Sequence, residues 1–122
     1  MLLATTTAKM QLITSAATNV RVAAEWADNA SGTITADGST TVITTATTTD
    51  IVAATGSSTK RRIKHLSIWN DDASVSNTVT VILNDGTNSP EQYVATLAAQ
   101  TGIDYIDGQG WAVKGSAVSG YP

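Results

Sequence analysis

The sequence contains no cysteine and no phenylalanine, and it has only two prolines and one histidine. Without cysteine the chain can form no disulfide, no thiolate metal site and no thiol nucleophile. Charged residues make up 14% of the chain, well below the usual share of about 25%. The net charge of −3 leaves no surplus of Lys and Arg for phosphate contacts, so we expect no nucleic-acid partner.

Long apolar runs are also missing. No stretch approaches the roughly 20 apolar residues that a membrane-crossing helix needs, and we expect no membrane partner. Residues 1–7 carry neither a charged segment nor a continuous apolar core, so we expect no cleaved signal peptide.

Threonine is unusually abundant, at about one residue in six, and Ala, Val and Ile dominate the apolar residues. Thr, Val and Ile are β-branched and favour strands over helices. A chain of 122 residues is the size of one domain. Because few charges oppose association, we expect much of the surface to be covered in an assembly.

Short alternating segments separated by turn residues predict strands throughout the chain. They cover residues 20–26, 33–36, 39–43, 50–54, 62–70, 78–83, 91–97, 103–106 and 111–114. Such spacing is typical of an all-β fold, and we predict an antiparallel β-sandwich or jelly-roll-like barrel of about 7–9 short strands. We expect an N-terminal arm or edge strand in residues 1–18, the sandwich in 19–114 and a tail in 115–122.

Two details of this prediction can be checked directly. Asp37-Gly38 lies between two β-rich runs and predicts a type I′ hairpin turn, because both central residues of that turn need positive φ. Residues 62–70 have apolar side chains on both faces, with Leu66 and Ile68 on one face and Ile63 and His65 on the other. This pattern predicts a central strand.

Residues able to perform catalysis are scarce. His65 could be drawn into a triad with Ser67 and Asp50, but the sequence has no nucleophile elbow, and a strand histidine is the better interpretation. Asp71-Asp72 and the stretch from Asp85 to Asn88 lack the alternating ligands of a calcium loop. We therefore predict no catalytic residue, no metal and no cofactor.

One cluster of charge stands out. Four of the seven basic residues lie close together: Lys60, Arg61, Arg62 and Lys64. They could dock on an acidic protein surface. Alternatively, they could be solvent-exposed charges at the start of a strand that protect a sheet edge. Trp69 and Trp111 are candidate interface aromatics, with core packing as the alternative.

Several stretches together resemble small structural proteins of tailed-phage virions. They are residues 49–54 (TDIVAA), 62–68 (RIKHLSI), 73–81 (ASVSNTVTV) and 105–111 (YIDGQGW), with an opening, 1–11 (MLLATTTAKMQ), that also looks like such proteins. The resemblance covers about half to two-thirds of the chain. It implies a virion component without catalytic residues, in the head or the tail.

Within that class we expect a decoration (cement) protein that binds the major capsid protein from outside, as a trimer at three-fold positions. Small size, low surface charge and an N-terminal arm suit this role. The alternatives are a tail, neck or fibre-associated protein, and a carbohydrate-binding β-sandwich used in host adsorption. The latter would use exposed Trp and Tyr.

Overall fold

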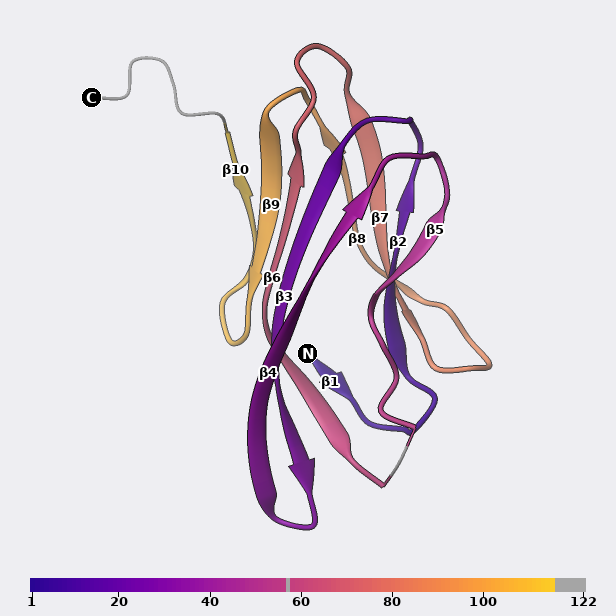
Figure 1. The fold of residues 1–122 in the computed structure, drawn as a ribbon, viewed down its shortest axis with the longest axis vertical. Helices are drawn as coiled ribbons and strands as arrows, with labels where there is room; N and C mark the ends of the chain where they lie inside the picture. The colour runs from indigo at the N-terminus through magenta and orange to yellow at the C-terminus, as the bar shows by residue number, and fades with distance from the viewer. Residues whose placement is uncertain (57, 116–122) are drawn as a thin grey trace, which may run out of the picture.

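The computed structural model describes residues 1–56 and 58–115, and this part of the chain contains strands but no helix. The strands are β1 (Leu2–Leu3), β2 (Lys9–Thr14), β3 (Val20–Ala30), β4 (Thr33–Ile43), β5 (Thr48–Val52), β6 (Lys60–Asn70), β7 (Asn77–Asn84), β8 (Glu91–Leu97), β9 (Thr101–Ile106) and β10 (Gly110–Lys114). They form two antiparallel sheets that pack together as a β-sandwich (Figure 1). The predicted all-β class is confirmed, with ten strands in the described residues instead of seven to nine.

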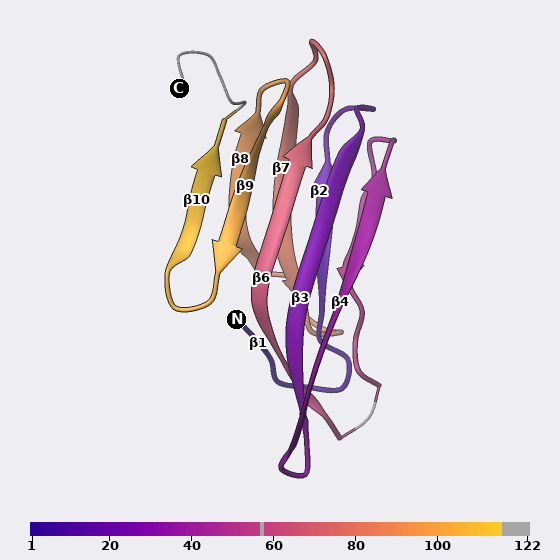
Figure 2. The same ribbon diagram turned by 60° about the vertical axis from the view of Figure 1, so that its left-hand side comes forward.

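The chain passes repeatedly between the two sheets. Sheet A has the order β10-β9-β6-β3-β4, and sheet B has the order β5-β2-β7-β8. The short β1 pairs with β6 beyond the point where β9 turns away, so it extends sheet A at that end. The β3–β4 hairpin projects past the rest of the sandwich, as Figure 1 and Figure 2 both show.

Alternating side chains from both sheets fill the core between them. In β3 the inward residues are Val20, Val22, Ala24 and Trp26, as the sequence pattern predicts. Aliphatic side chains replace the missing phenylalanine; those fully buried include Leu3, Met10, Leu12, Ile63, Leu66, Ile68, Val79, Val81, Leu97 and Ile103. Each contributes roughly 1.5–3 kcal/mol by leaving water.

A β-bulge divides the central strand β6 into two parts. Glu25 of β3 pairs with His65, but the next residue, Trp26, pairs with Ile63, which leaves Lys64 as the extra residue. The extra residue shifts the alternation, so that Ile63 and Leu66 are both buried. The prediction that Ile63 shares the face of His65 is therefore wrong, whereas the central position of β6, between β3 and β9, is confirmed.

Residues 1–18 do not form an arm, and only the two-residue β1 lies at a sheet edge. Their main element, β2, lies between β5 and β7, and β1 pairs with β6. Met10 and Leu12 alternate into the core and are fully buried, which holds this strand inside sheet B. The sandwich therefore includes these residues and does not begin at residue 19. Of the predicted tail, 115–122, only Gly115 lies within the described residues.

The predicted hairpin turn at Asp37-Gly38 is also wrong. Both residues lie inside β4, which pairs with β3 over its whole length without a register shift. The turn is at Ser31-Gly32, where φ is 52° and 90°, the positive values of a type I′ turn. Gly38 meets a different need, since a Cβ there would lie 2.7 Å from the Ala24 carbonyl oxygen.

The strands predicted at 78–83, 91–97, 103–106 and 111–114 are confirmed as β7, β8, β9 and β10. β8 returns antiparallel to β7, and β9 and β10 form a hairpin across residues 107–109. The strand predicted at 50–54 lies slightly earlier, at Thr48–Val52. Strong alternation in these segments was sufficient to locate them.

Gly102 gives a test of the close packing of β9 against β6. A Cβ on Gly102 would overlap the Ile68 carbonyl oxygen and lie 2.9 Å from Cε3 of Trp69. We expect Gly102→Ala to lower the free energy of unfolding by about 3 kcal/mol, the upper end for overpacking. Gly115→Ala is the control, because its Cβ would meet nothing within 4 Å. Equal denaturant midpoints for the two variants would contradict this account.

Candidate docking face

The alternation of β6 separates the four basic residues of the predicted cluster. Lys60, Arg62 and Lys64 are exposed on the outer face of sheet A, while Arg61 is partly buried on the opposite side of the strand. The cluster is therefore not a single patch. Three of its members are exposed to a partner, and the fourth has a structural role.

Arg61 joins sheet A to the segment that follows β5. Its Nε and Nη2 donate to the two carboxylate oxygens of Asp28 at 2.8 and 3.0 Å, and its Nη1 donates to the Ala53 carbonyl at 2.9 Å. The guanidinium also lies 4.4 Å from the centre of the Trp26 ring. A planar, bidentate and stacked arrangement of this kind is specific to arginine. With its side chain only 13% exposed, Arg61 is unavailable for docking.

Asp107, in the turn of the β9–β10 hairpin, contacts three positively charged groups. Its carboxylate accepts hydrogen bonds from the Met1 amino group at 3.0 Å and from Arg62 Nε at 2.9 Å, and Lys64 Nζ lies 3.7 Å away. The hydrogen bonds from Met1 and Arg62 hold the pKa of Asp107 far below its usual range. The Met1 amino group also bonds the Tyr105 hydroxyl at 2.8 Å, which ties β1 to β9.

The exposed basic residues surround a shallow depression of about 340 Å³ on the outer face of sheet A. We call it the basic depression; its apolar contacts are Leu2, Ala27 and Ile34, and its cations are Lys60, Arg62 and Lys64. Leu2 and Ile34 are exposed although they are large and apolar. Asp28 and Asp107 neutralise only part of the surrounding positive charge. The combination suits a partner surface that is acidic and partly apolar.

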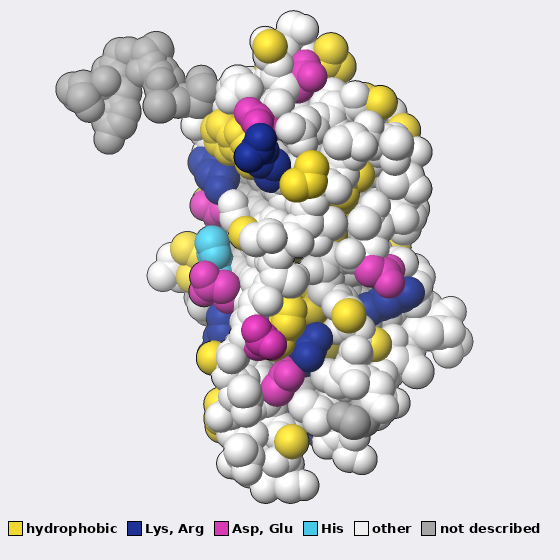
Figure 3. All heavy atoms as spheres, in the orientation of Figure 1, with side chains coloured by type: hydrophobic (Ala, Val, Ile, Leu, Met, Phe, Trp, Pro, Cys, Tyr) yellow, Lys and Arg dark blue, Asp and Glu magenta, His cyan; other side chains and the backbone are white. Residues whose placement is uncertain are grey.

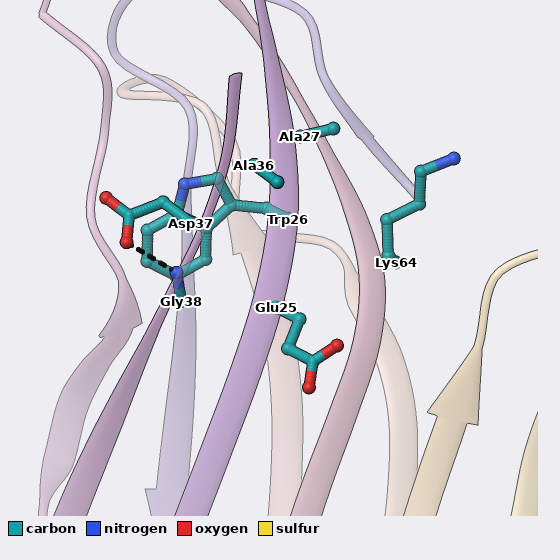
Figure 4. Close-up of a pocket in the computed structure, with 7 residues that line it drawn as sticks. All are labelled: Glu25, Trp26, Ala27, Ala36, Asp37, Gly38 and Lys64. Carbon is teal, nitrogen blue, oxygen red and sulfur yellow. Dashed lines mark hydrogen bonds between the residues drawn. The ribbon is translucent and has the colours of Figure 1, made fainter. Parts of the chain in front are cut away.

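A second hollow, of about 480 Å³, adjoins the basic depression and shares Ala27 and Lys64 with it. Figure 4 shows Ala36 and Gly38 of β4 on one side of it, with Glu25 and Lys64 on the other. The hollow exists because alanine and glycine occupy outward positions of β3 and β4. It is open and lies on a sheet face, so it widens the docking face without forming an enclosed substrate cavity.

The two candidate interface tryptophans do not share a surface. Trp111 stacks on Tyr93 with ring centres 4.8 Å apart and planes 8° apart, and it meets Tyr105 at 5.1 Å. This aromatic group packs against the core between β8 and β10. Trp69 instead lies on the outer face of sheet A, near Arg21 and Val42. Both tryptophans are half-buried, and no common aromatic platform results.

The residues drawn into a triad are also separated. Asp50 lies on β5 of sheet B and pairs with Lys9, whereas His65 and Ser67 lie on β6. The carboxylate near them is Asp104, whose Oδ1 is 3.8 Å from His65 Nε2 and 2.8 Å from Lys114 Nζ. Lys114 also donates to Ser67 Oγ at 2.6 Å, so the hydrogen-bond partner of this hydroxyl is a lysine.

Residues 1–56 and 58–115 contain no group of three or more Asp, Glu or His side chains placed to hold a metal ion. No helix in this part of the chain could cross a membrane.

Sequence reasoning missed a second surface, the outer face of sheet B. Ile13, Thr78, Thr80, Val94 and Thr96 on this face are uncharged and partly or fully exposed. Gln11 and the Lys9–Asp50 ion pair lie on the same face, towards β5. The hydroxyls of Thr78 and Thr96 bond across the strands at 2.9 Å. The period-two pattern of β7 and β8 could have revealed this Thr-rich face. Figure 3 shows, on one side of the molecule, how thinly charge is spread over the surface.

Comparison with known proteins adds no relative, since no family model, curated protein or solved structure matches the chain. The function is therefore inferred from the chain's own surfaces.

Replacing Arg61 tests its structural role. We expect Arg61→Ala to destabilise the fold by about 2–4 kcal/mol, because Asp28 loses its bidentate partner and Trp26 loses its stacked cation. Lys60→Ala, one position away and exposed, is the control and should change stability by less than about 0.5 kcal/mol. Urea unfolding of both variants measures the difference. Equal stability would mean that Arg61 is not structural.

The Asp107 contacts predict a specific pH dependence. The pKa of Asp107 is lower in the folded chain than in the unfolded one, so its contribution is complete above about pH 4 and is lost as the pH falls toward the folded value. We expect Asp107→Asn to be less stable than the parent at pH 7 and to approach it in strong acid. Thermal unfolding across pH measures this. A constant difference at every pH would contradict the ion-pair account.

Proposed function

We propose that this chain is a structural protein of a tailed-phage virion that binds the outside of the capsid as a decoration protein. The observation that carries the proposal is the basic depression, where excess positive charge surrounds exposed apolar side chains on an otherwise weakly charged surface. The resemblance of the β5, β6, β7 and β9–β10 sequences to virion proteins gives the biological setting.

The chemistry of the docking face suits protein-protein contact. An acidic and partly apolar patch of the major capsid protein would pair with Lys60 and Lys64 and cover Leu2 and Ile34. Charge complementarity of this kind gives specificity and fast association. A protein that binds only the assembled shell stabilises it by mass action, and no chemical step is needed.

The weakly charged outer face of sheet B supports the same role. A freely dispersed protein usually keeps charges of both signs across its surface. Here Ile13 of β2 and the outward side chains Thr78, Thr80, Val94 and Thr96 of β7 and β8 are uncharged and lose little solvation when another protein covers them. A subunit that is held between neighbours can tolerate such a face.

The proposal predicts that the basic depression is needed for capsid binding. Purified chain should co-sediment with particles of its phage that lack it, and Lys60→Glu with Lys64→Glu should weaken binding at least about tenfold by reversing two charges. Lys9→Glu with Arg21→Glu is the control, since it makes the same change in net charge outside the depression. Equal weakening by both pairs would remove the depression from the docking site.

The number of copies per particle tests the decoration role itself. A decoration protein is present in hundreds of copies per virion, whereas a tail component is present in a few to dozens. Quantitative mass spectrometry of intact particles separates these outcomes. A few dozen copies, or none, would contradict capsid decoration.

A further inference from the structure

β4 is a long strand with one unpaired edge. It has eleven residues, ends sheet A and pairs regularly with β3. Within residues 1–56 and 58–115 the other sheet edges are shorter, and both edges of sheet B adjoin register shifts. Asp37 is the only charged residue of β4. Long, regular and weakly charged edges are the sites at which another strand adds to a sheet.

The backbone of Gly38 shows which groups point to the free edge. Its N–H donates to the Asp37 carboxylate at 2.8 Å, as the dashed line in Figure 4 marks. This N–H is therefore not used in the backbone hydrogen bonds between β4 and β3. In an antiparallel ladder the outward groups belong to every second residue. The N–H and C=O groups of the even-numbered residues from Ile34 to Val42 therefore point to the free edge. In a strand pair the Gly38 N–H would exchange the Asp37 carboxylate for a backbone carbonyl of the partner.

From the sequence of β4 we infer that the partner is a second copy of the same strand. If two copies pair antiparallel with Gly38 on a two-fold axis, Ile34 faces Val42 of the other copy and Ala36 faces Thr40. These two aliphatic residues are the most exposed large apolar side chains of the hairpin, at 64% and 62%. On the other face of the strand, Asp37 lies opposite Ser39 and Thr35 opposite Thr41, so no like charges meet.

Neighbouring registers fit less well. An axis at Asp37 sets the two Asp37 carboxylates against each other, which is destabilising. An axis at Ser39 sets Ile34 opposite Thr44, beyond the end of β4. Gly38 also suits the axis, because two backbones approach there without side chains between them.

The pair would join two copies of sheet A into one continuous sheet. Since the axis is perpendicular to the sheet, both basic depressions would lie on the same outer face. A two-fold pair also differs from the trimer expected from the sequence. The inference does not depend on the proposed capsid role, because it concerns contacts between copies of this chain alone.

The test is self-association measured by sedimentation equilibrium of the full chain. A single-strand interface is small, so we expect a monomer-dimer equilibrium with a Kd between about 10 µM and 1 mM. A monomer throughout this range would overturn the inference. A trimer, or an open series of larger species, would also overturn it, because a two-fold contact closes at two copies.

A charge cycle tests the register. Glu and Lys are placed at Ile34 and Val42 in all four combinations. The two positions are about 26 Å apart along one strand and cannot interact within a chain. In the proposed pair, opposite charges meet when the two positions differ in sign, and like charges meet when they match. We expect the two variants with one Glu and one Lys to dimerise, on average, about tenfold more tightly than the two variants with the same residue at both positions.

The same cycle at Val75 and Val94, which are about half-exposed and lie outside β4, is the control and should show no coupling. Because all four positions are exposed, thermal unfolding should confirm that every variant folds. Dimers without coupling between positions 34 and 42 would overturn the Gly38-centred pairing.

Discussion

The extra residue at Lys64 in β6 determines how the two sheets and the outer surface fit together. Before the bulge, Arg61 points towards Trp26 and Asp28, and Ile63 enters the core. After it, the core-facing residues are the even-numbered Leu66 and Ile68, whereas before it they are odd-numbered. The Lys64 carbonyl accepts the Asp107 amide at 2.9 Å, which fixes where β9 leaves β6. Without this shift, either the core residues or the basic residues of β6 would be on the wrong side.

The sequence was most informative where alternation was strong. β7, β8, the β9–β10 hairpin and the part of β6 after its bulge have apolar residues at every second position, and burial of one face leaves little freedom of register. The Thr-rich composition and the spacing of the alternating segments were enough to predict an all-β class. These features are local, and local features are what a single sequence reports well.

The wrong predictions fall where pairing with a strand far along the chain determines the local structure. Asp37-Gly38 is a strong turn signal, yet Ser31-Gly32 takes the positive φ values and pairing along all of β3 keeps Gly38 in the strand. Residues 9–14 were assigned to an arm or edge strand because their neighbours, β5 and β7, are far along the chain. For Arg61, period two alone would have placed it opposite Lys60 and Arg62. Its pairing with Asp28 required knowledge of the β3–β6 register.

The central position of β2 has a consequence for how the chain folds during synthesis. β2 is made early, but its two neighbours, β5 and β7, leave the ribosome only after several further strands. At usual elongation rates β7 follows β2 by roughly 4–14 s. During that time Met10 and Leu12 have no sheet to enter, and sheet B cannot close. An early strand that must wait in this way is safer if it is short and only moderately apolar, and β2 is both.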